Sequence, residues 1–281
     1  MWNDETKTFT IPYNNKCKLD YLPENTKILI FEENLNIKEY SQFNSSVDNL
    51  PKSLQHLQLG TNFNKPVENL PESLQYLMFG EKFNRPVDNL PESLQHLTFG
   101  YRFNKPVNYL PQSLQYLMFG DNFSKPVDNL PNSITHLTFG IVFNKPVDNL
   151  PLNLLFLKFG IAFNKPVNNL PPNLKSLIFG CNFNQSIDKL PKSIEFLSFG
   201  YMFNQSTDSL PTSITHLCFY SKVKMNNIPE TVNTLKIFFS DKDKHSGYVD
   251  NLPITIKKII INDMSKKHLV KIPFGCEIVE A

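Results

Sequence analysis

Hydrophobic and polar positions alternate along this chain with a period of twenty residues. One period, residues 70–89, reads L-P-E-S-L-Q-Y-L-M-F-G-E-K-F-N-R-P-V-D-N. Apolar residues recur as L-x-x-L-x-[LF], from Leu54-Leu57-Leu59 to Ile214-Leu217-Phe219. Because the L-x-[LF] part alternates as a half-buried strand does, each period predicts one short strand whose apolar side chains face a core.

Two prolines in most periods, such as Pro66 and Pro71, exclude a regular helix from the segment that returns to the next strand. That segment must be extended or contain a single tight turn, and successive strands then stack in parallel. We therefore expect a mainly β fold, a right-handed solenoid of about twelve short coils with a parallel sheet and little or no α-helix.

Aromatic and amide side chains occupy fixed columns of the repeat. One phenylalanine column runs from Phe79 to Phe219 and a second from Phe63 to Phe203, both in steps of twenty residues. An asparagine follows most members of the second column, with Ser124 as the exception. These columns predict two stacked phenylalanine spines and an asparagine ladder that bonds the backbone of its own turn and the next coil.

Eight of the ten glycines, from Gly60 to Gly200, also fall in one column directly after the strand. Glycine in that place is typical of a bulge or of a backbone with positive φ. None of these glycines belongs to a G-x-G-x-x-G or phosphate-loop motif, so we assign them a structural role.

The unit F-N-x-P-V followed by L-P-x-S-L-x-x-L-x-F-G, as at 83–87, resembles the FNIP repeat family over roughly residues 43–219. That family occurs in social amoebae and in giant viruses of amoebae and is related to leucine-rich repeats. Its members resemble adaptors or scaffolds, and some carry an N-terminal F-box. Because no F-box is recognisable here, the resemblance does not imply a ubiquitin-ligase role.

The period divides the chain into three parts of one continuous domain. Residues 1–42 form an N-terminal cap with one diverged repeat, 43–219 the regular array, and 220–281 diverged repeats with a C-terminal cap. The polar insert 240–247 predicts a loop.

Composition narrows the class of protein. The 281 residues are 41% hydrophobic and 19% charged with a net charge of +2, which does not indicate disorder or a nucleic-acid partner. We expect no signal peptide, no membrane span and no membrane partner. The four cysteines form no C-x-x-C motif, which favours a reducing cytoplasm. They are Cys17, Cys181, Cys218 and Cys276.

Candidate chemical sites give little support to catalysis. His56, His96, His136 and His216 share one outward-facing column. Histidines two coils apart stand about 9.6 Å from each other, too far to share a zinc ion. A self-stacking aromatic stripe fits this column better. The same spacing separates Cys181 from Cys218, which argues against a disulfide. We expect no cofactor and no metal.

Two charged columns lie near each other in the repeat, one basic and one acidic. The basic column is Lys65, Arg85, Lys105, Lys125, Lys145 and Lys165, and the acidic column contains Glu68, Asp88, Asp128, Asp148, Asp188 and Asp208. Because the acids cancel most of the basic field, we expect no nucleic-acid binding.

The residue pair after each glycine is polar at both ends of the array and apolar in its middle. Together with variable strand positions, this predicts a protein-binding face. Its candidate residues are Tyr116, His136, Ile141, Val142, Phe156, Ile161, Ala162, Ile178, Cys181 and Phe196. Two interpretations stay open: the turn pair is exposed for binding, or it is tucked under a neighbouring turn.

The sequence thus predicts a monomeric, non-enzymatic scaffold that binds an unknown protein, in a host cytoplasm if the protein is viral. Catalysis needs unlike groups that converge in a pocket, whereas this chain offers like groups in rows. The alternative is a structural protein that assembles through the ends or faces of its solenoid.

Overall fold

The computed structural model describes residues 1–16, 19, 21–33, 38–221, 223, 225, 227–239, 249–250, 252–263, 267 and 270–281. It divides into two compact units, unit 1 (Met1–Lys145) and unit 2 (Pro146–Ala281), each of which is described by itself. Within the described ranges there is no α-helix. Cys17 and the predicted loop at 240–247 lie outside the described residues.

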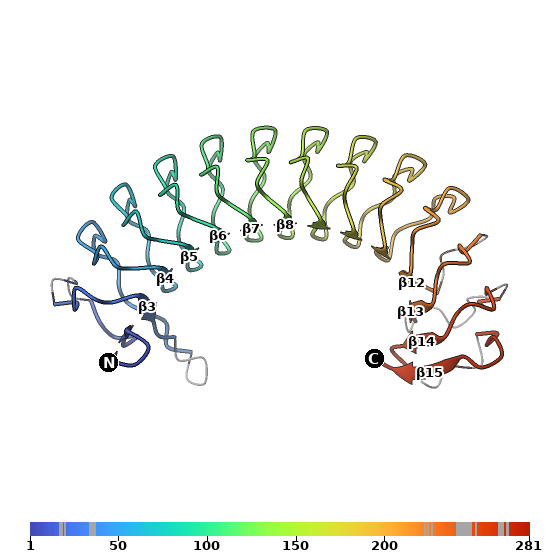
Figure 1. Ribbon diagram of the computed structural model, residues 1–281, viewed down its shortest axis with the longest axis horizontal. Coiled ribbons are helices and arrows are strands. Elements are labelled where there is room, and N and C mark those ends of the chain that lie inside the picture. The colour runs from blue at the N-terminus through green and yellow to red at the C-terminus, as the bar shows by residue number, and fades with distance from the viewer. Residues whose placement is uncertain are drawn as a thin grey trace. The chain divides into compact units, whose positions relative to one another are not determined.

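Unit 1 contains a sheet whose strands pair in chain order (Figure 1). The strands are β1 (Trp2–Asn3), β2 (Thr8–Ile11), β3 (Ile28–Phe31), β4 (His56–Gln58), β5 (Tyr76–Met78), β6 (His96–Thr98), β7 (Tyr116–Met118) and β8 (His136–Thr138). All neighbours from β2 to β8 are parallel. β1 pairs with β2 in the antiparallel sense, a hairpin that the repeat pattern did not predict.

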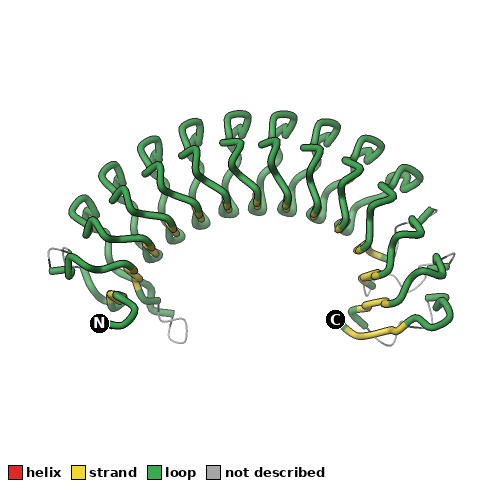
Figure 2. The backbone as a smooth tube through the Cα atoms, in the orientation of Figure 1, coloured by secondary structure: helices red, strands yellow, loops and turns green. Residues whose placement is uncertain are grey.

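Unit 2 repeats this arrangement with parallel neighbours throughout. Its strands are β9 (Phe156–Lys158), β10 (Ser176–Ile178), β11 (Phe196–Ser198), β12 (His216–Tyr220), β13 (Thr234–Phe238), β14 (Lys258–Ile261) and β15 (Glu277–Glu280). In both units one edge of each coil carries the strand and the rest is turn and loop (Figure 2). The predicted mainly β, parallel solenoid is confirmed.

Each coil follows from its local sequence. The central leucine of the strand is buried, as at Leu77, while its two neighbours face outward. The L-P-x-S-L segment is a tight turn, closed by the amide of Leu74, which donates to the carbonyl of Pro71 at 3.0 Å. Because proline pre-sets φ and lacks an amide proton, it suits this turn and prevents a helix.

The two phenylalanine columns form the core of each coil. Successive rings of one column, such as Phe63 and Phe83, have centroids 6.1 Å apart and lie nearly parallel. The second column stacks in the same way, with 5.6 Å between Phe79 and Phe99. Within one coil the columns meet at 3.7 Å between Phe79 and Phe83. Burial of each ring contributes roughly 1.5–3 kcal/mol, and the predicted spines are confirmed.

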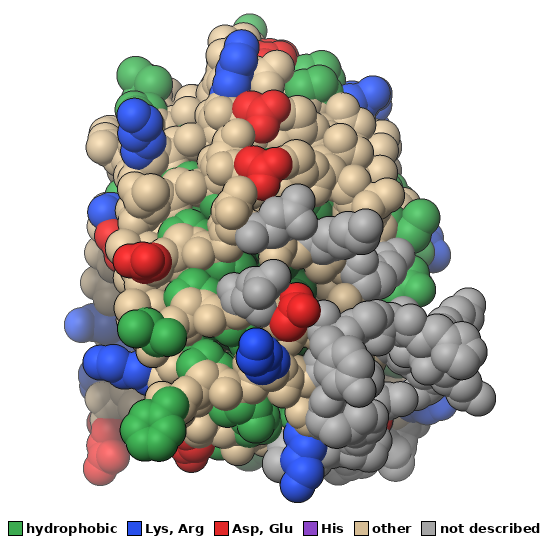
Figure 3. Space-filling view, turned by 90° about the vertical axis from the view of Figure 1, so that its right-hand side faces the viewer, with side chains coloured by type: hydrophobic (Ala, Val, Ile, Leu, Met, Phe, Trp, Pro, Cys, Tyr) green, Lys and Arg blue, Asp and Glu red, His purple; other side chains and the backbone are tan. Residues whose placement is uncertain are grey.

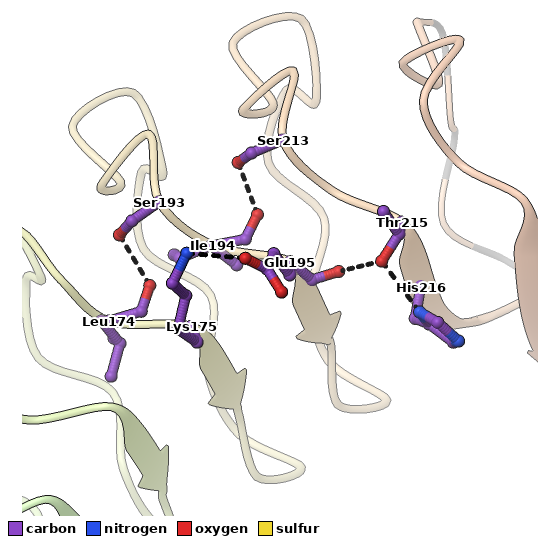
Figure 4. A network of polar contacts seen from close by, with 8 residues as sticks. All are labelled: Leu174, Lys175, Ser193, Ile194, Glu195, Ser213, Thr215 and His216. Atoms are coloured by element: carbon purple, nitrogen blue, oxygen red, sulfur yellow. Dashed lines mark hydrogen bonds and ion pairs between the residues drawn. The ribbon is translucent and has the colours of Figure 1, made fainter.

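Polar ladders join the coils where the sheet does not reach. The amide of Asn84 donates to Oδ1 of Asn64, and that of Asn104 to Oδ1 of Asn84, both at 3.0 Å. This confirms the predicted asparagine bond to the next coil. A serine column acts in parallel: Ser193 Oγ donates to the carbonyl of Leu174 at 2.7 Å (Figure 4). These side chains satisfy backbone groups that would otherwise be buried unpaired.

The glycine column does not have the positive φ that the sequence suggested. Among the described glycines, positive φ occurs only at Gly275, so the column does not serve a left-handed conformation. The reason is close packing between coils: a Cβ atom built on Gly100 would lie 2.1 Å from the carbonyl oxygen of Gly80. Glycine is required here because the backbones of successive coils approach too closely for any side chain.

Glu33 closes the N-terminal side of the first regular coil. Its carboxylate accepts hydrogen bonds from the amide of Ser41 at 2.8 Å and from that of Thr61 at 2.6 Å. The side chain thus supplies acceptors in the place where no regular coil precedes.

Candidate protein-binding surface

The outward side of five neighbouring strands of unit 1, β4 to β8, forms a surface that we call the ladder face. Strand register aligns the first residues of these strands in one column and the third residues in another. The first column is His56, Tyr76, His96, Tyr116 and His136, and the second is Gln58, Met78, Thr98, Met118 and Thr138.

The rings of the first column stack on one another. Centroids lie 5.4 Å apart between His56 and Tyr76 and 3.9 Å apart between Tyr76 and His96. Tyr116 lies 4.3 Å from His96 on one side and 4.3 Å from His136 on the other. The predicted self-stacking stripe is therefore present. A ring covered on both faces has its edge left for a partner, and ring edges carry partial positive charge.

Exposure alternates from strand to strand across this surface. On β5, Tyr76 and Met78 are 40% and 43% exposed, and on β7, Tyr116 and Met118 are 38% and 49% exposed. The shorter side chains of β6, His96 and Thr98, are only partly exposed. The ladder face thus consists of two Tyr-Met ridges, on β5 and β7, with a lower strip on β6 between them.

The ladder face carries no formally charged residue. Burial lowers the pKa of His56, His96 and His136 below the usual histidine value, and the charge of His136 lowers that of His96 further. Thr135 Oγ1 lies 2.9 Å from Nδ1 of His136 and holds that ring in place. At pH 7 the three imidazoles are therefore neutral, and the surface consists of apolar and uncharged polar groups.

The corresponding sheet face of unit 2 is different in chemistry. Its two outward columns hold Lys158, Lys236, Lys258 and Glu277, and Lys236 lies 5.1 Å from the ring centroid of Phe238. Just before β10 and β11, Lys175 and Glu195 form an ion pair at 2.6 Å (Figure 4). The sheet face of unit 2 therefore offers charge of both signs rather than a neutral surface. On the turn side of the C-terminal coils, basic and acidic side chains also lie among hydrophobic ones (Figure 3).

The residues predicted from the sequence fall at two positions of the coil. In unit 1, Tyr116 and His136 lie on the ladder face and stack, while Ile141 and Val142 form the turn after Gly140 and are 41% and 40% exposed. In unit 2, strand positions hold Phe156, Ile178 and Phe196, and turns hold Ile161, Ala162 and Cys181. Ile161 is 47% exposed, so Ile141, Val142 and Ile161 are not covered by a neighbouring turn, whereas Ala162 and Cys181 are only partly exposed.

Sequence reasoning missed Tyr76, Met78 and Met118. The signal was the alternation of Y-L-M with H-L-T in successive coils, a period of forty residues within the period of twenty. The search for apolar pairs after the glycine did not consider this longer period.

The described histidine, cysteine and carboxylate side chains do not form a metal site. Within the described ranges no three His, Cys, Asp or Glu side chains are placed to hold a metal ion. Cys181, Cys218 and Cys276 are free thiols, and burial raises the pKa of Cys218 to about 11, so it stays protonated. The described part of the chain also contains no helix able to cross a membrane.

Comparison with known proteins identifies the family to which the repeat belongs. The FNIP repeat family model matches residues 43–82, 83–122, 106–141, 123–161, 163–202 and 183–222, more than half of the chain. This chain belongs to the FNIP repeat family. No curated protein matches it.

Two solved structures share the fold of this FNIP chain. CroV588, described as a circular leucine-rich-repeat protein and coming from a giant virus, is 37% identical with a TM-score of 0.75. The match covers 92% of this chain and 40% of CroV588. YopM from Yersinia enterocolitica is 20% identical with a TM-score of 0.56, and the match covers 91% of this chain and 55% of YopM. The fold is therefore of the leucine-rich-repeat type, and the chain spans about half or less of each of these proteins.

Proposed function

We propose that this FNIP protein is a non-enzymatic scaffold that binds a protein partner through the ladder face of unit 1. The observation that carries this proposal is the group of four exposed side chains, Tyr76, Met78, Tyr116 and Met118, on a surface without formal charge. Contiguous exposed apolar surface of this kind marks interaction sites. Tyr and Met are also enriched where proteins meet.

The energetic case rests on how well these side chains are already ordered. The stacked neighbours hold Tyr76 and Tyr116 in place, so a partner that covers them loses little side-chain entropy. Met78 and Met118 are flexible and polarizable and can adapt to an irregular partner surface. Rigid aromatic anchors beside adaptable methionines favour a specific contact.

The remaining candidate residues form secondary contacts in this proposal. In unit 1 they are Ile141 and Val142, and in unit 2 they are Phe156, Ile161, Ala162, Ile178, Cys181 and Phe196. The 37% identity with a giant-virus protein supports a partner among host proteins of the cytoplasm. The proposed scaffold is a monomer that binds no nucleic acid.

The test is quantitative capture of cellular partners on the immobilised protein. Replacement of Met78 and Met118 by Glu inserts two charges into the ladder face and should lower capture by about tenfold, as loss of central contacts does. Met202, 51% exposed on a turn of unit 2, gives the matched control Met202→Glu. Equal capture by the double variant and the control would refute this role for the ladder face.

A second candidate function is self-assembly through the coils of unit 2. Phe274 is fully exposed, and Ile254 and Ile272 are 89% and 47% exposed. Light scattering over a range of concentrations separates the two functions. A mass that stays at one chain excludes assembly, whereas a rising mass that Phe274→Glu abolishes would establish it.

A further inference from the structure

The anchors of the ladder face recur every second strand. β5 and β7, which carry the Tyr-Met ridges, have β6 between them, and this places the ridges about 9.6 Å apart at ordinary strand spacing. The lower strips recur at the same interval on β4, β6 and β8, each with a histidine and a short polar side chain. The surface therefore has a period of two coils along the direction that crosses the strands.

This period matches an α-helix. Seven residues of a helix, two turns, advance about 10.5 Å, which is within about 1 Å of the two-coil interval. Same-face side chains of an extended strand repeat about every 6.8 Å and fall out of step with the ridges. An extended segment that binds by backbone pairing needs the edge of a sheet, and the ladder face lies on its flat side.

We infer that the ladder face binds an amphipathic α-helix that lies across the strands with apolar side chains seven residues apart. This inference rests on the proposed function and specifies its partner. The helix would place one apolar side chain over each lower strip, at His56/Gln58, His96/Thr98 and His136/Thr138, between and beside the two ridges. Such packing of ridges into grooves is how helices ordinarily meet a corrugated surface.

The chemistry of the surface determines which side chains that helix can place against it. The contact columns hold no Lys, Arg, Asp or Glu, so a charged side chain on the contact stripe of the helix would lose its hydration without finding a partner. The contact stripe must therefore be uncharged, and charges belong on the opposite side of the helix. Exposed ring edges at Tyr76 and Tyr116 add a preference for aromatic side chains in that stripe, because the negative face of a ring fits the partly positive edge of another.

Three fluorescently labelled peptides of equal length test this inference by anisotropy titration against the full chain; the heptad and scrambled peptides share one composition. The first is a helix of three heptads with leucines at one heptad position and its neighbour four residues later. The second is a scrambled sequence, and the third alternates leucine with polar residues as a strand does. We expect the heptad peptide to bind at least about tenfold more tightly than the other two.

A variant of the chain distinguishes fitted packing from general stickiness. Thr98→Met fills the central strip and makes the surface more apolar. The affinity of the chain for the heptad peptide should nevertheless fall by about fivefold, because the groove between the ridges is lost. Ser198→Met, at the same place in a coil of unit 2, is the matched control and should leave binding unchanged.

Several results would overturn the helix assignment. They are tighter binding by Thr98→Met, equal or better binding of the strand or scrambled peptide, and absence of saturable binding by the heptad peptide. If capture of cellular partners still depends on Met78 and Met118 in that case, the proposed function stands and only the helix is refuted. If capture does not depend on them, both proposals are wrong.

Discussion

The interior packing of unit 1 is repeated in unit 2, but the outward surfaces of the two units differ. In unit 1 the centroids of Phe83 and Phe103 lie 6.1 Å apart, and in unit 2 those of Phe163 and Phe183 lie 6.1 Å apart. On the sheet face, however, unit 1 carries neutral His-Tyr stacks, whereas the same columns of unit 2 hold Lys158, Lys236 and Glu277. The geometry of the coil fixes the inward columns, whereas the outward columns are free to vary. Differences in function between the units must therefore lie in the outward columns.

The largest expected effect is common to both units. Gly100→Ala and Gly180→Ala would place a Cβ atom 2.1 Å and 1.9 Å from the carbonyl oxygen of the preceding glycine. Because backbone cannot yield as a flexible side chain does, each change should lower the free energy of unfolding by about 3 kcal/mol. Urea denaturation followed by circular dichroism measures this. A marked difference between the two variants would show that the interiors are not equivalent.

Gly275 provides the control for that experiment. It has φ of +76°, and no atom lies within 4 Å of the place that a Cβ atom would take, so its alanine variant meets conformational strain but no clash. We expect Gly275→Ala to cost about 1 kcal/mol, clearly less than the other two glycine variants.

The asparagine ladder should show a moderate effect that is larger in unit 2. Asn84 Oδ1 accepts one bond, from the amide of Asn104. Asn184 Oδ1 accepts two, from the amide of Asn204 at 2.8 Å and from Nε2 of Gln205 at 2.9 Å. Replacement by Ala leaves these donors unpaired and should lower stability by about 1 kcal/mol for Asn84 and about 2 kcal/mol for Asn184.

Hydrogen exchange at Asn104 and Asn204 reports this loss directly, because these amides lose their acceptors. Ser124→Ala is the matched control within the same column and should change stability by less than about 0.5 kcal/mol. Equal losses for all three variants would contradict the ladder as a source of stability.

Acidification should lower the stability of unit 1 selectively, and by less than the asparagine substitutions do. Burial lowers the folded-state pKa of His56, His96 and His136, so the unfolded chain takes up protons first as the pH falls. Their contribution is fully present above the unfolded value near 6.5 and declines as the pH falls from there through the folded values. Hydrogen exchange of β4 to β8 should accelerate over this range. A His96→Phe variant should respond less, and an unchanged profile would refute the titration.

The smallest expected effect belongs to unit 2. Lys175 and Glu195 are paired at 2.6 Å, but their side chains are 51% and 53% exposed, so water screens the pair. A double-mutant cycle to Ala should give a coupling free energy below about 0.5 kcal/mol that vanishes in high salt. A coupling above about 1.5 kcal/mol would show that the pair of Lys175 and Glu195 contributes to the stability of the fold.

Most of the fold could be predicted from the sequence because its determinants repeat. The L-x-[LF] strand, the phenylalanine spines and the Asn64–Asn84–Asn104 bonds all follow from columns that stay fixed over many coils. The β1–β2 hairpin could not be predicted, since it occurs once and lacks the repeat motif. The role of the glycine column was misassigned because sequence does not reveal how closely two backbones approach.

The candidate site was predicted only in part. Tyr116 and His136 lie on the ladder face, and the stacking of their column follows from strand register. The alternation of Y-L-M with H-L-T marks Met78 and Met118 in the sequence, but how far each side chain is exposed depends on its packing against the neighbouring strands, which only the structure gives.

The polar ladders have a direction. The amide of Asn84 reaches back to Asn64, and the hydroxyl of Ser93 reaches back to the carbonyl of Leu74, so each winding is completed by the one that follows it. An insertion or deletion of one whole winding would rejoin every donor to an equivalent acceptor. Inside the regular array a change of one residue more or fewer would set the inner columns of that winding out of step, so the gene segment for residues 43–219 keeps its pattern when it lengthens or shortens by sixty nucleotides. Windings of other lengths occur only outside that segment, as between His216 and Thr234 or between Thr234 and Lys258.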